Sequence, residues 1–133
     1  MKALTIWQPW AACICHGDKR VENRGWRPPD NIVGEVIAVH AGKMYDARGE
    51  QEIIRLGLEI PPRRYRTTYG AILGLATVKG VSRHLPDDPW FSGPFGWLLD
   101  DVRPLDHPVP CRGAQGLWTV PPEILESVLK GAN

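Results

Sequence analysis

The chain has 133 residues, of which 43% are hydrophobic and 23% are charged. These values are typical of a globular domain and exclude a disordered or fibrous chain; at this length about two thirds of the unfolded surface is buried around one core, so residues 1–133 are expected to form a single domain. The formal net charge of +1 excludes a protein that coats nucleic acid by charge alone, because such proteins need a strongly basic surface.

Basic residues are concentrated in the first half of the chain. Up to Arg66 there are 11 Lys and Arg against 8 Asp and Glu, and from Thr67 onward there are 5 against 7. A local basic site in the first half is therefore expected, and it suits a short single strand of nucleic acid better than a long duplex.

We expect neither a membrane span nor a secretory signal in this sequence. No apolar run approaches the roughly 20 residues that a spanning helix needs. Gln8 and Pro9 interrupt the apolar stretch that follows Lys2. We therefore expect a cytoplasmic protein without a membrane partner.

The three cysteines are expected to be reduced, because their number is odd and the chain shows no sign of export. Cys13, Cys15 and His16 suggest a zinc site as an alternative. A C-x-C pair on a helix, however, points its two sulfurs apart, unlike the C-x-x-C pair of a zinc knuckle. We interpret these cysteines as buried free thiols and expect no metal and no other cofactor.

The first elements are a strand, a short helix and a central strand. Residues 3–6 have the pattern of a strand, and Pro9 with Trp10 begins a helix that ends near His16. The predictions that follow along the chain are an extended segment at 20–24, a loop at 25–31 and a strand at 34–41. The last is apolar on both faces, which predicts a strand covered on each side in the middle of the fold.

The remaining elements complete a mixed fold. A helix is predicted at 45–56, a loop at 58–68, a long strand at 69–81, a proline-rich link at 85–94, strands at 96–105 and 117–120, and a closing helix after Pro121. Glycines alternate with apolar residues along 69–81, which is typical of a strand that bends at a barrel corner. The fold class is therefore predicted to be α+β, a mixed β-barrel with flanking short helices.

Three stretches of the sequence together resemble the ASCH family. The first is LTIWQPWA followed by GDKRVENR, which is similar to the family signature G-x-K-x-x-E-x-R at Gly17, Lys19, Glu22 and Arg24. The second is VHAGK at the end of the central strand, and the third is PVPCRGAQGLWTV. Their order and spacing span the chain from Leu4 to Val120.

The resemblance implies a PUA-like barrel with a cleft that binds RNA or another nucleic acid. Some relatives are amidohydrolases that remove the acyl group from acetylated cytidine, and another is a nuclease that cuts single-stranded RNA. The amidohydrolases carry a threonine nucleophile where Glu22 stands here. A carboxylate cannot simply replace that hydroxyl in acyl transfer, so Glu22 suits ligand binding or acid–base chemistry better.

The signature residues are candidates for phosphate and base recognition. Residues two apart on an extended segment share a face, so Glu22 and Arg24 lie together. Lys19 joins them if the chain turns after Gly17. Such a carboxylate either orients the cations toward a phosphate or accepts a base N–H. The alternative is a surface ion pair worth under about 1 kcal/mol.

Aromatic and amide side chains near the signature supply further candidates. Trp7, Gln8, Pro9 and Trp10 lie on a strand-to-helix turn, where an indole stacks on a base and an amide reads its edge, although a core role for at least one tryptophan is the alternative. Trp26 and Arg27 on a polar loop, and Gln115 between two glycines, are the other candidates for nucleic-acid binding. The cluster Arg63, Arg64 and Arg66 is either a solvated surface or a contact for a phosphate backbone.

A catalytic interpretation depends on residues near the end of the central strand. His40 and Lys43 flank that end and Tyr45 follows. If the protein cleaves RNA, Lys43 and Tyr45 with Lys19 are the candidate base, acid and charge, with no metal needed. The alternative for His40, which is also a candidate for nucleic-acid binding, is a core histidine with satisfied hydrogen bonds.

Three functional hypotheses follow from these residues and this resemblance. The leading one is a module that binds single-stranded RNA or a modified nucleoside in a basic, tryptophan-flanked cleft. The second is a metal-independent hydrolase, either a ribonuclease on single-stranded RNA or an amidohydrolase on acetylated cytidine. The third is a domain that binds a protein partner in a transcription assembly, because the family name derives from a coactivator.

Overall fold

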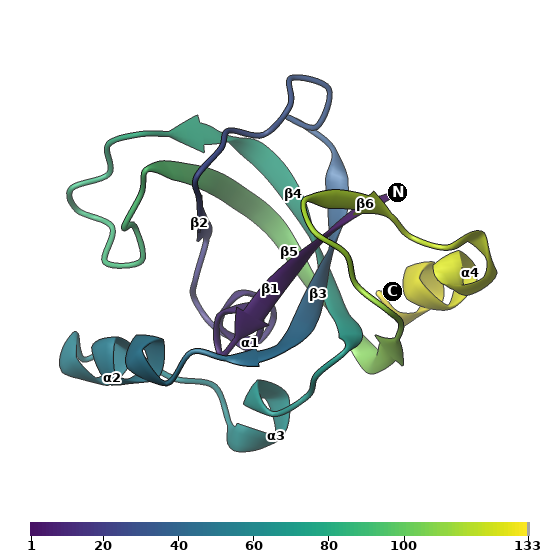
Figure 1. Cartoon of the computed structure of the whole chain (residues 1–133), viewed down its shortest axis with the longest axis horizontal. Coiled ribbons are helices and arrows are strands. Elements are labelled where there is room, and N and C mark those ends of the chain that lie inside the picture. Colours follow the sequence, from purple (N-terminus) through teal and green to yellow (C-terminus); the bar gives the residue numbers. More distant parts are fainter. Residues whose placement is uncertain (133) are drawn as a thin grey trace.

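The computed structural model describes residues 1–132, which form one six-stranded sheet flanked by short helices (Figure 1). The strands are β1 (Lys2–Gln8), β2 (Val21–Arg24), β3 (Val36–Tyr45), β4 (Ala71–Ser82), β5 (Phe95–Pro110) and β6 (Leu117–Thr119). The helices are α1 (Trp10–Cys15), α2 (Ala47–Arg55), α3 (Arg63–Arg66) and α4 (Pro122–Gly131).

The sheet is strongly curved but open. Its strand order is β2-β5-β4-β3-β1-β6, with β1 and β3 parallel and the other neighbours antiparallel. Figure 1 shows the long strands β4 and β5 bending together, and their pairing shifts register at three places, which is how bulges bend a strand pair. The predicted α+β class with short helices is confirmed, whereas closure into a barrel is not, because β2 and β6 end the sheet.

Two hydrophobic clusters cover the two faces of the sheet. Successive residues of a strand point to opposite faces, so Leu4 belongs to the cluster around α1 and Ala3 to the cluster under α4. Trp97 is the largest fully buried side chain of the α1 cluster, and Val128 anchors α4 to the other. The face with α1 also carries α2 and α3 at its edge (Figure 1), and this edge is where the cavity described below lies.

Most predicted elements are confirmed, with differences in three places. Strand β3 runs to Tyr45, beyond the predicted end at residue 41, so that α2 begins only at Ala47. Residues 63–66 form the short helix α3 instead of continuing a loop, because Pro62 begins a turn that the Thr67 hydroxyl closes by donating to the Arg63 carbonyl. Strand β5 runs to Pro110, beyond the predicted end at residue 105. Its prolines are accommodated where the register to β4 shifts, so they do not end the strand.

The cysteines are free thiols, as predicted. Cys13 and Cys15 are buried on α1, and burial raises the pKa of each to about 12, which keeps both protonated. Within residues 1–132 no cluster of His, Cys, Asp and Glu has the composition of a metal site. None of the helices in the same range is long and apolar enough to cross a bilayer.

Gln8 is a structural residue at the end of β1. Its side chain is fully buried, and its amide donates to the carbonyls of Tyr65 (2.9 Å) and Thr68 (2.8 Å). Its oxygen accepts the backbone N–H of Ala12 at 3.0 Å. These three bonds join β1, α1 and the α3 segment. Because these bonds use both polar atoms of the Gln8 amide, the side chain is not free to read a base edge, which is the role that the sequence suggests.

Replacing Gln8 by Ala is expected to lower the free energy of unfolding by about 3 kcal/mol, because two carbonyls and one N–H lose their partner inside the protein. The matched control is Gln51→Ala, at an exposed position of α2, which should change stability by less than about 0.5 kcal/mol. Urea unfolding followed by far-UV circular dichroism measures both. Equal stabilities of the two variants would contradict this role.

Candidate functional site

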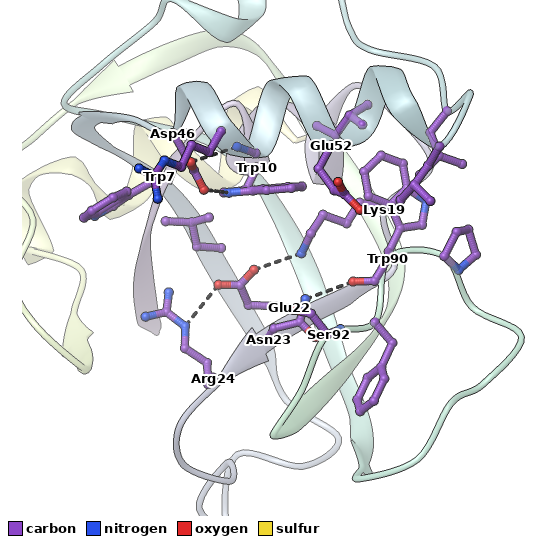
Figure 2. A pocket seen from close by; sticks show the side chains of 18 of the residues that line it. Trp7, Trp10, Lys19, Glu22, Asn23, Arg24, Asp46, Glu52, Trp90 and Ser92 are labelled. Atoms are coloured by element: carbon purple, nitrogen blue, oxygen red, sulfur yellow. Dashed lines mark hydrogen bonds and ion pairs between the residues drawn. The ribbon is translucent and has the colours of Figure 1, made fainter.

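A cavity of about 630 Å³ lies between the sheet edge, α2 and the link before β5 (Figure 2). Its lining comes from segments far apart in the sequence: β1, the start of α1, β2, α2 and residues 89–92. The lining residues used below are Thr5, Trp7, Trp10, Lys19, Glu22, Asn23, Arg24, Asp46, Arg48, Gly49, Glu52, Trp90, Phe91 and Ser92. We call it the main cavity.

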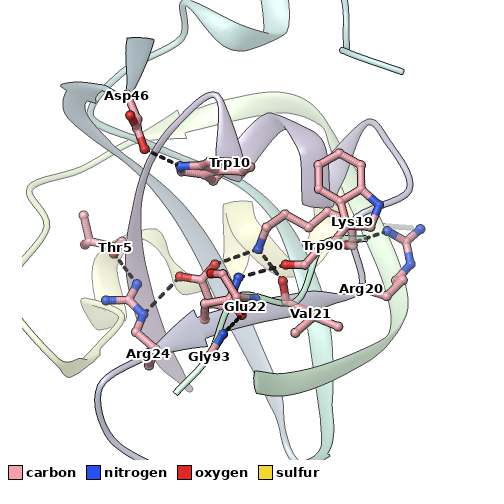
Figure 3. Close-up of polar contacts among 12 residues, drawn as sticks. Thr5, Trp10, Lys19, Arg20, Val21, Glu22, Arg24, Asp46, Trp90 and Gly93 are labelled. Atoms are coloured by element: carbon pink, nitrogen blue, oxygen red, sulfur yellow. Dashed lines mark hydrogen bonds and ion pairs between the residues drawn. The ribbon is translucent and has the colours of Figure 1, made fainter. Parts of the chain in front are cut away.

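The floor of the main cavity is a carboxylate held between two cations (Figure 3). Lys19 Nζ donates to Glu22 Oε1 at 3.0 Å and also to the Val21 carbonyl. On the other side, Arg24 Nε lies 3.0 Å from Glu22 Oε2 with its N–H turned away from that oxygen, so this contact is an ion pair without a good hydrogen bond. Arg24 Nη2 donates to the Thr5 carbonyl at 2.8 Å, which ties β2 to β1.

Burial makes the ion pairs of this triad important for stability. Lys19 is only 2% exposed and Glu22 only 6%. Removing one partner of such a buried pair leaves the other charge uncompensated, at a cost of about 3–5 kcal/mol. Within residues 1–132, Glu22 Oε1 accepts the hydrogen bond from Lys19 and Oε2 accepts none, and a carboxylate oxygen has about two acceptor sites, so Glu22 keeps acceptor capacity.

The Trp10 indole lies between α2 and the Glu22 carboxylate (Figure 2). Its Nε1 donates to Asp46 Oδ2 at 3.0 Å, and the same carboxylate caps α2 by accepting the Gly49 N–H at 2.8 Å. A Cβ on Gly49 would stand 2.3 Å from Trp10 Cζ2, so only glycine lets α2 pack this closely. Lys19 Nζ lies 5.7 Å from the ring centroid of Trp10, within the range of a cation–π contact.

The opposite wall is the link at residues 89–92, and one side chain holds it in place. Asn23 on β2 donates through Nδ2 to the Trp90 carbonyl at 2.9 Å. Its Oδ1 accepts the N–H groups of Ser92 (2.9 Å) and Gly93 (3.0 Å). Trp90 then meets Trp10 edge-on, with ring centroids 6.5 Å apart. Two indoles at right angles therefore line the cavity that also contains Glu22.

The charges that line the main cavity balance. The cations are Lys19, Arg24 and Arg48, and the acids are Glu22, Asp46 and Glu52. Within residues 1–132, Arg48 is the lining cation that has no acidic partner within 4 Å. A neutral aromatic ligand with hydrogen-bonding edges fits this lining better than a group with a large negative charge.

The match to a family model decides the classification. The model of the ASCH domain matches residues 4–91, which include β1, the ion triad, α2 and the Trp90 wall. The chain belongs to the ASCH domain family. No curated protein matches the chain.

Solved ASCH structures have the same fold. An ASCH structure from Zymomonas mobilis is 15% identical, with a TM-score of 0.59, and the match covers 97% of this chain and 93% of that one. A serine-to-alanine mutant of the Zymomonas mobilis protein matches at 14% identity and a TM-score of 0.57 (97% and 94% covered), and a tyrosine-to-phenylalanine mutant at 14% and 0.58 (97% and 96%). At this identity the likeness shows the ASCH fold alone.

Five of the residues singled out in the sequence line the main cavity of the ASCH domain: Trp7, Trp10, Lys19, Glu22 and Arg24. Trp7 is 52% exposed at the rim, whereas the other four are buried or half-buried. The turn after Gly17 that Lys19 requires is present, because the Lys19 N–H bonds back to the Cys13 carbonyl at 3.1 Å. The signature therefore forms one cluster.

The other candidates for nucleic-acid binding lie outside the main cavity. Pro9 is buried at the start of α1 beside Gln8, and His40 is buried on β3. Trp26 and Arg27 are exposed on the loop after β2, where the Trp26 ring packs edge-on against Trp97. Lys43 and Gln115 are exposed on β3 and before β6.

The three candidate catalytic residues do not share one site. Lys19 is in the main cavity, Lys43 is exposed at the end of β3, and Tyr45 lines a second hollow of about 420 Å³ beside α3. There the Tyr45 hydroxyl donates to Glu50 and accepts from Arg66 Nη1 at 2.8 Å. Burial and the bond to Glu50 raise the pKa of Tyr45, which makes it a less available acid near neutral pH.

The residues that sequence reasoning missed are Asp46, Asn23 and Trp90. Asp46 carries a readable signal, because an aspartate three residues before Gly49 at the start of a helical pattern is a typical N-cap. Asn23 is the unassigned position inside the signature, next to Glu22. Trp90 lies in a proline-rich link, and no local pattern indicates that this link folds back on β2.

His40 belongs to a hydrogen-bonded network in the core. Its Nε2 faces the Cys111 carbonyl at 2.8 Å and must therefore carry the proton, which leaves Nδ1 to accept from the Thr5 hydroxyl at 3.1 Å. Trp118 Nε1 donates to the same hydroxyl oxygen at 3.0 Å. The network joins β1, β3 and the segment that leads into β6. Burial lowers the pKa of His40, and the bond to Cys111 opposes this shift only in part.

The free energy of unfolding is expected to fall as the pH drops below about 6.5, because unfolded His40 then binds a proton that the folded state disfavours. The contribution of neutral His40 to the free energy of unfolding is complete above that pH, and it is lost progressively as the pH falls to the pKa of His40 in the folded state. In His40→Asn this part of the pH dependence should disappear. Urea unfolding between pH 5 and 8 measures it, with exposed His84→Asn as the control. Burial and Arg64 also lower the pKa of His16, so part of the slope remains, and a slope as steep in His40→Asn as in the wild type would contradict the assignment.

Gly49→Ala is expected to displace Trp10 or α2 and to lower the free energy of unfolding by about 1–3 kcal/mol, because the new methyl overlaps the indole and the Asp46 carboxylate. Gly25→Ala is the matched control, since a Cβ there meets nothing within 4 Å. Thermal unfolding and near-UV circular dichroism of the tryptophans report the two effects. Identical spectra and stabilities in both variants would refute the close packing.

Proposed function

We propose that this ASCH domain binds single-stranded RNA or a modified nucleoside by holding one base in the main cavity. The observation that carries the proposal is that two indoles, Trp10 and Trp90, line the same cavity as the carboxylate of Glu22. ASCH domains are generally linked to RNA binding. The size of the cavity lies within the range of about 300–1,000 Å³ that is usual for small-molecule sites.

The lining supplies the two contacts that an unpaired base needs. Tryptophan faces stack on any base, and such stacking contributes about 1–3 kcal/mol per base. The free acceptor sites of Glu22 match the N–H groups on the edge of a base. Half-buried Arg24, whose Nη1 makes no bond within the described residues 1–132, adds a donor beside them for a base carbonyl or ring nitrogen.

The ion triad positions the acceptor before a ligand arrives. Lys19 and Arg24 hold the carboxylate of Glu22 from both sides, so it loses little conformational freedom on binding. Lys19 itself has little exposed surface and acts through Glu22, not on a phosphate. The balanced charge of the lining supports recognition of a base, with phosphates remaining outside the cavity.

Trp90→Ala should weaken the binding of a single-stranded RNA octamer by about 5- to 150-fold, which corresponds to the loss of one stacked base. Trp26→Ala is the control, because it also removes an indole but from a position that does not line the main cavity. Fluorescence anisotropy with an end-labelled octamer of mixed sequence measures both variants. If Trp90→Ala binds as tightly as Trp26→Ala, the base does not occupy this cavity.

A further inference from the structure

Helix α3 lies beside the second hollow, across α2 from the main cavity, and is firmly attached to the rest of the protein. The amide of Gln8 holds the carbonyls of Tyr65 and Thr68, as described above. The Tyr65 ring stacks on His16 with centroids 3.7 Å apart and planes 10° from parallel. Arg66 donates to the Pro61 carbonyl at 2.8 Å and pairs with Glu50 on α2. These contacts place α3 beside both α1 and α2.

Two arginines of α3 have no acidic partner. Arg63 and Arg64 are exposed, and within residues 1–132 neither has a carboxylate within 4 Å. The Arg64 guanidinium lies 4.7 Å from the Tyr65 ring centroid, so its orientation is partly defined by cation–π contact. Arg63 lines the second hollow together with Arg66 and Tyr69. Glu50, the acid of that hollow, is already paired with Arg66.

Helix α2 separates the main cavity from the second hollow. Arg48, Gly49 and Glu52 face the main cavity, whereas Glu50 and Ile54 face the hollow beside α3. Figure 1 shows α2 and α3 at one edge of the fold, and the ion pair of Glu50 with Arg66 joins them. Within residues 1–132, Arg48 at the main cavity and Arg63 and Arg64 on α3 have no carboxylate within 4 Å, so cations without an acidic partner lie both at the cavity and beyond α2.

We propose that Arg63 and Arg64 bind the phosphates of nucleotides that flank the base in the main cavity, so that the ligand is a strand of RNA and not a free nucleoside. This inference rests on the proposed function and deepens it. The main cavity and α3 differ in charge, and this difference suggests different roles. The cavity is balanced and selects a base, whereas α3 carries unpaired guanidinium groups that suit the charge of a phosphodiester and release counterions on binding.

The test compares Arg63→Ala/Arg64→Ala with Lys2→Ala/Lys79→Ala, which removes the same charge elsewhere. Lys2 is at the opposite end of β1 from Gln8, about 20 Å from the α3 side at the rise of a strand, and Lys79 is near the far end of β4. All four side chains are exposed, so both variants are expected to fold, and circular dichroism melts are used to check this. Arg66 is left intact because it holds Tyr45 and Glu50.

Anisotropy with the labelled RNA octamer is measured from about 50 to 200 mM salt. The arginine variant should lose roughly tenfold in affinity at the low end, and the slope of log K against log salt should become shallower by about 0.7 for each phosphate that the variant no longer binds. The lysine variant should behave as the wild type. Trp90→Ala should lose affinity with the slope unchanged, because stacking releases no counterions.

The outcomes separate the two proposals. If the arginine variant matches the lysine variant in affinity and slope while Trp90→Ala is weakened, α3 does not contact the strand but the base site stands. If Trp90→Ala is not weakened, the base site fails, and the flanking role of α3 fails with it. If the wild type binds cytidine, uridine, adenosine or guanosine as tightly as the octamer, the ligand is a nucleoside and this inference is overturned. If none of these probes binds, the flanking role of α3 is overturned and unmodified RNA is removed from the proposed ligands.

Discussion

The buried ion triad of Lys19, Glu22 and Arg24 is the constraint on which the rest of the site depends. Taking charges out of water costs several kcal/mol per ion, and only close pairing and additional hydrogen bonds offset it. The fold supplies both, because the turn after α1 places Lys19 beside Glu22, and the hydrogen bond from Arg24 to the Thr5 carbonyl joins β2 to β1. β2 is an edge strand of four residues that pairs only with β5 in the sheet, so this polar link adds a second attachment.

The tryptophans above the triad are placed by polar contacts that start from the same segments. Asp46 accepts from Trp10 and caps α2 with one carboxylate, so the helix and the indole cannot move independently. Asn23, next to Glu22, does the same for the Trp90 segment through three hydrogen bonds. The site is thus preorganised by short polar side chains, whose own positions are set by β2 and by the start of α2. Preorganisation of this kind lowers the entropy cost of binding.

Much of the fold and part of the site could be predicted from the sequence. The central strand was readable because it is apolar on both faces, and Lys19, Glu22 and Arg24 could be grouped by the spacing of the signature. The burial of His40 and Gln8 could not be decided, because their hydrogen-bond partners, Cys111 and Tyr65, are 71 and 57 residues away. For the same reason Asn23 and Trp90, 67 residues apart, carried no local signal. Local patterns predict which residues share a strand, but not which distant carbonyl an amide meets.

The distribution of charge follows from this polar framework. The cations closest to the cavity floor are engaged in holding Glu22, which explains why a basic signature produces a nearly neutral cavity. Net charge within a motif is therefore a poor guide to the charge of the cavity that the motif lines. Guanidinium groups without an acidic partner are on helices α2 and α3, and α2 separates the main cavity from the hollow beside α3. Under the proposed function, a neutral, aromatic cavity beside exposed arginines would separate the selection of a base from the attraction of a strand, since stacking is insensitive to salt and phosphate contacts are not.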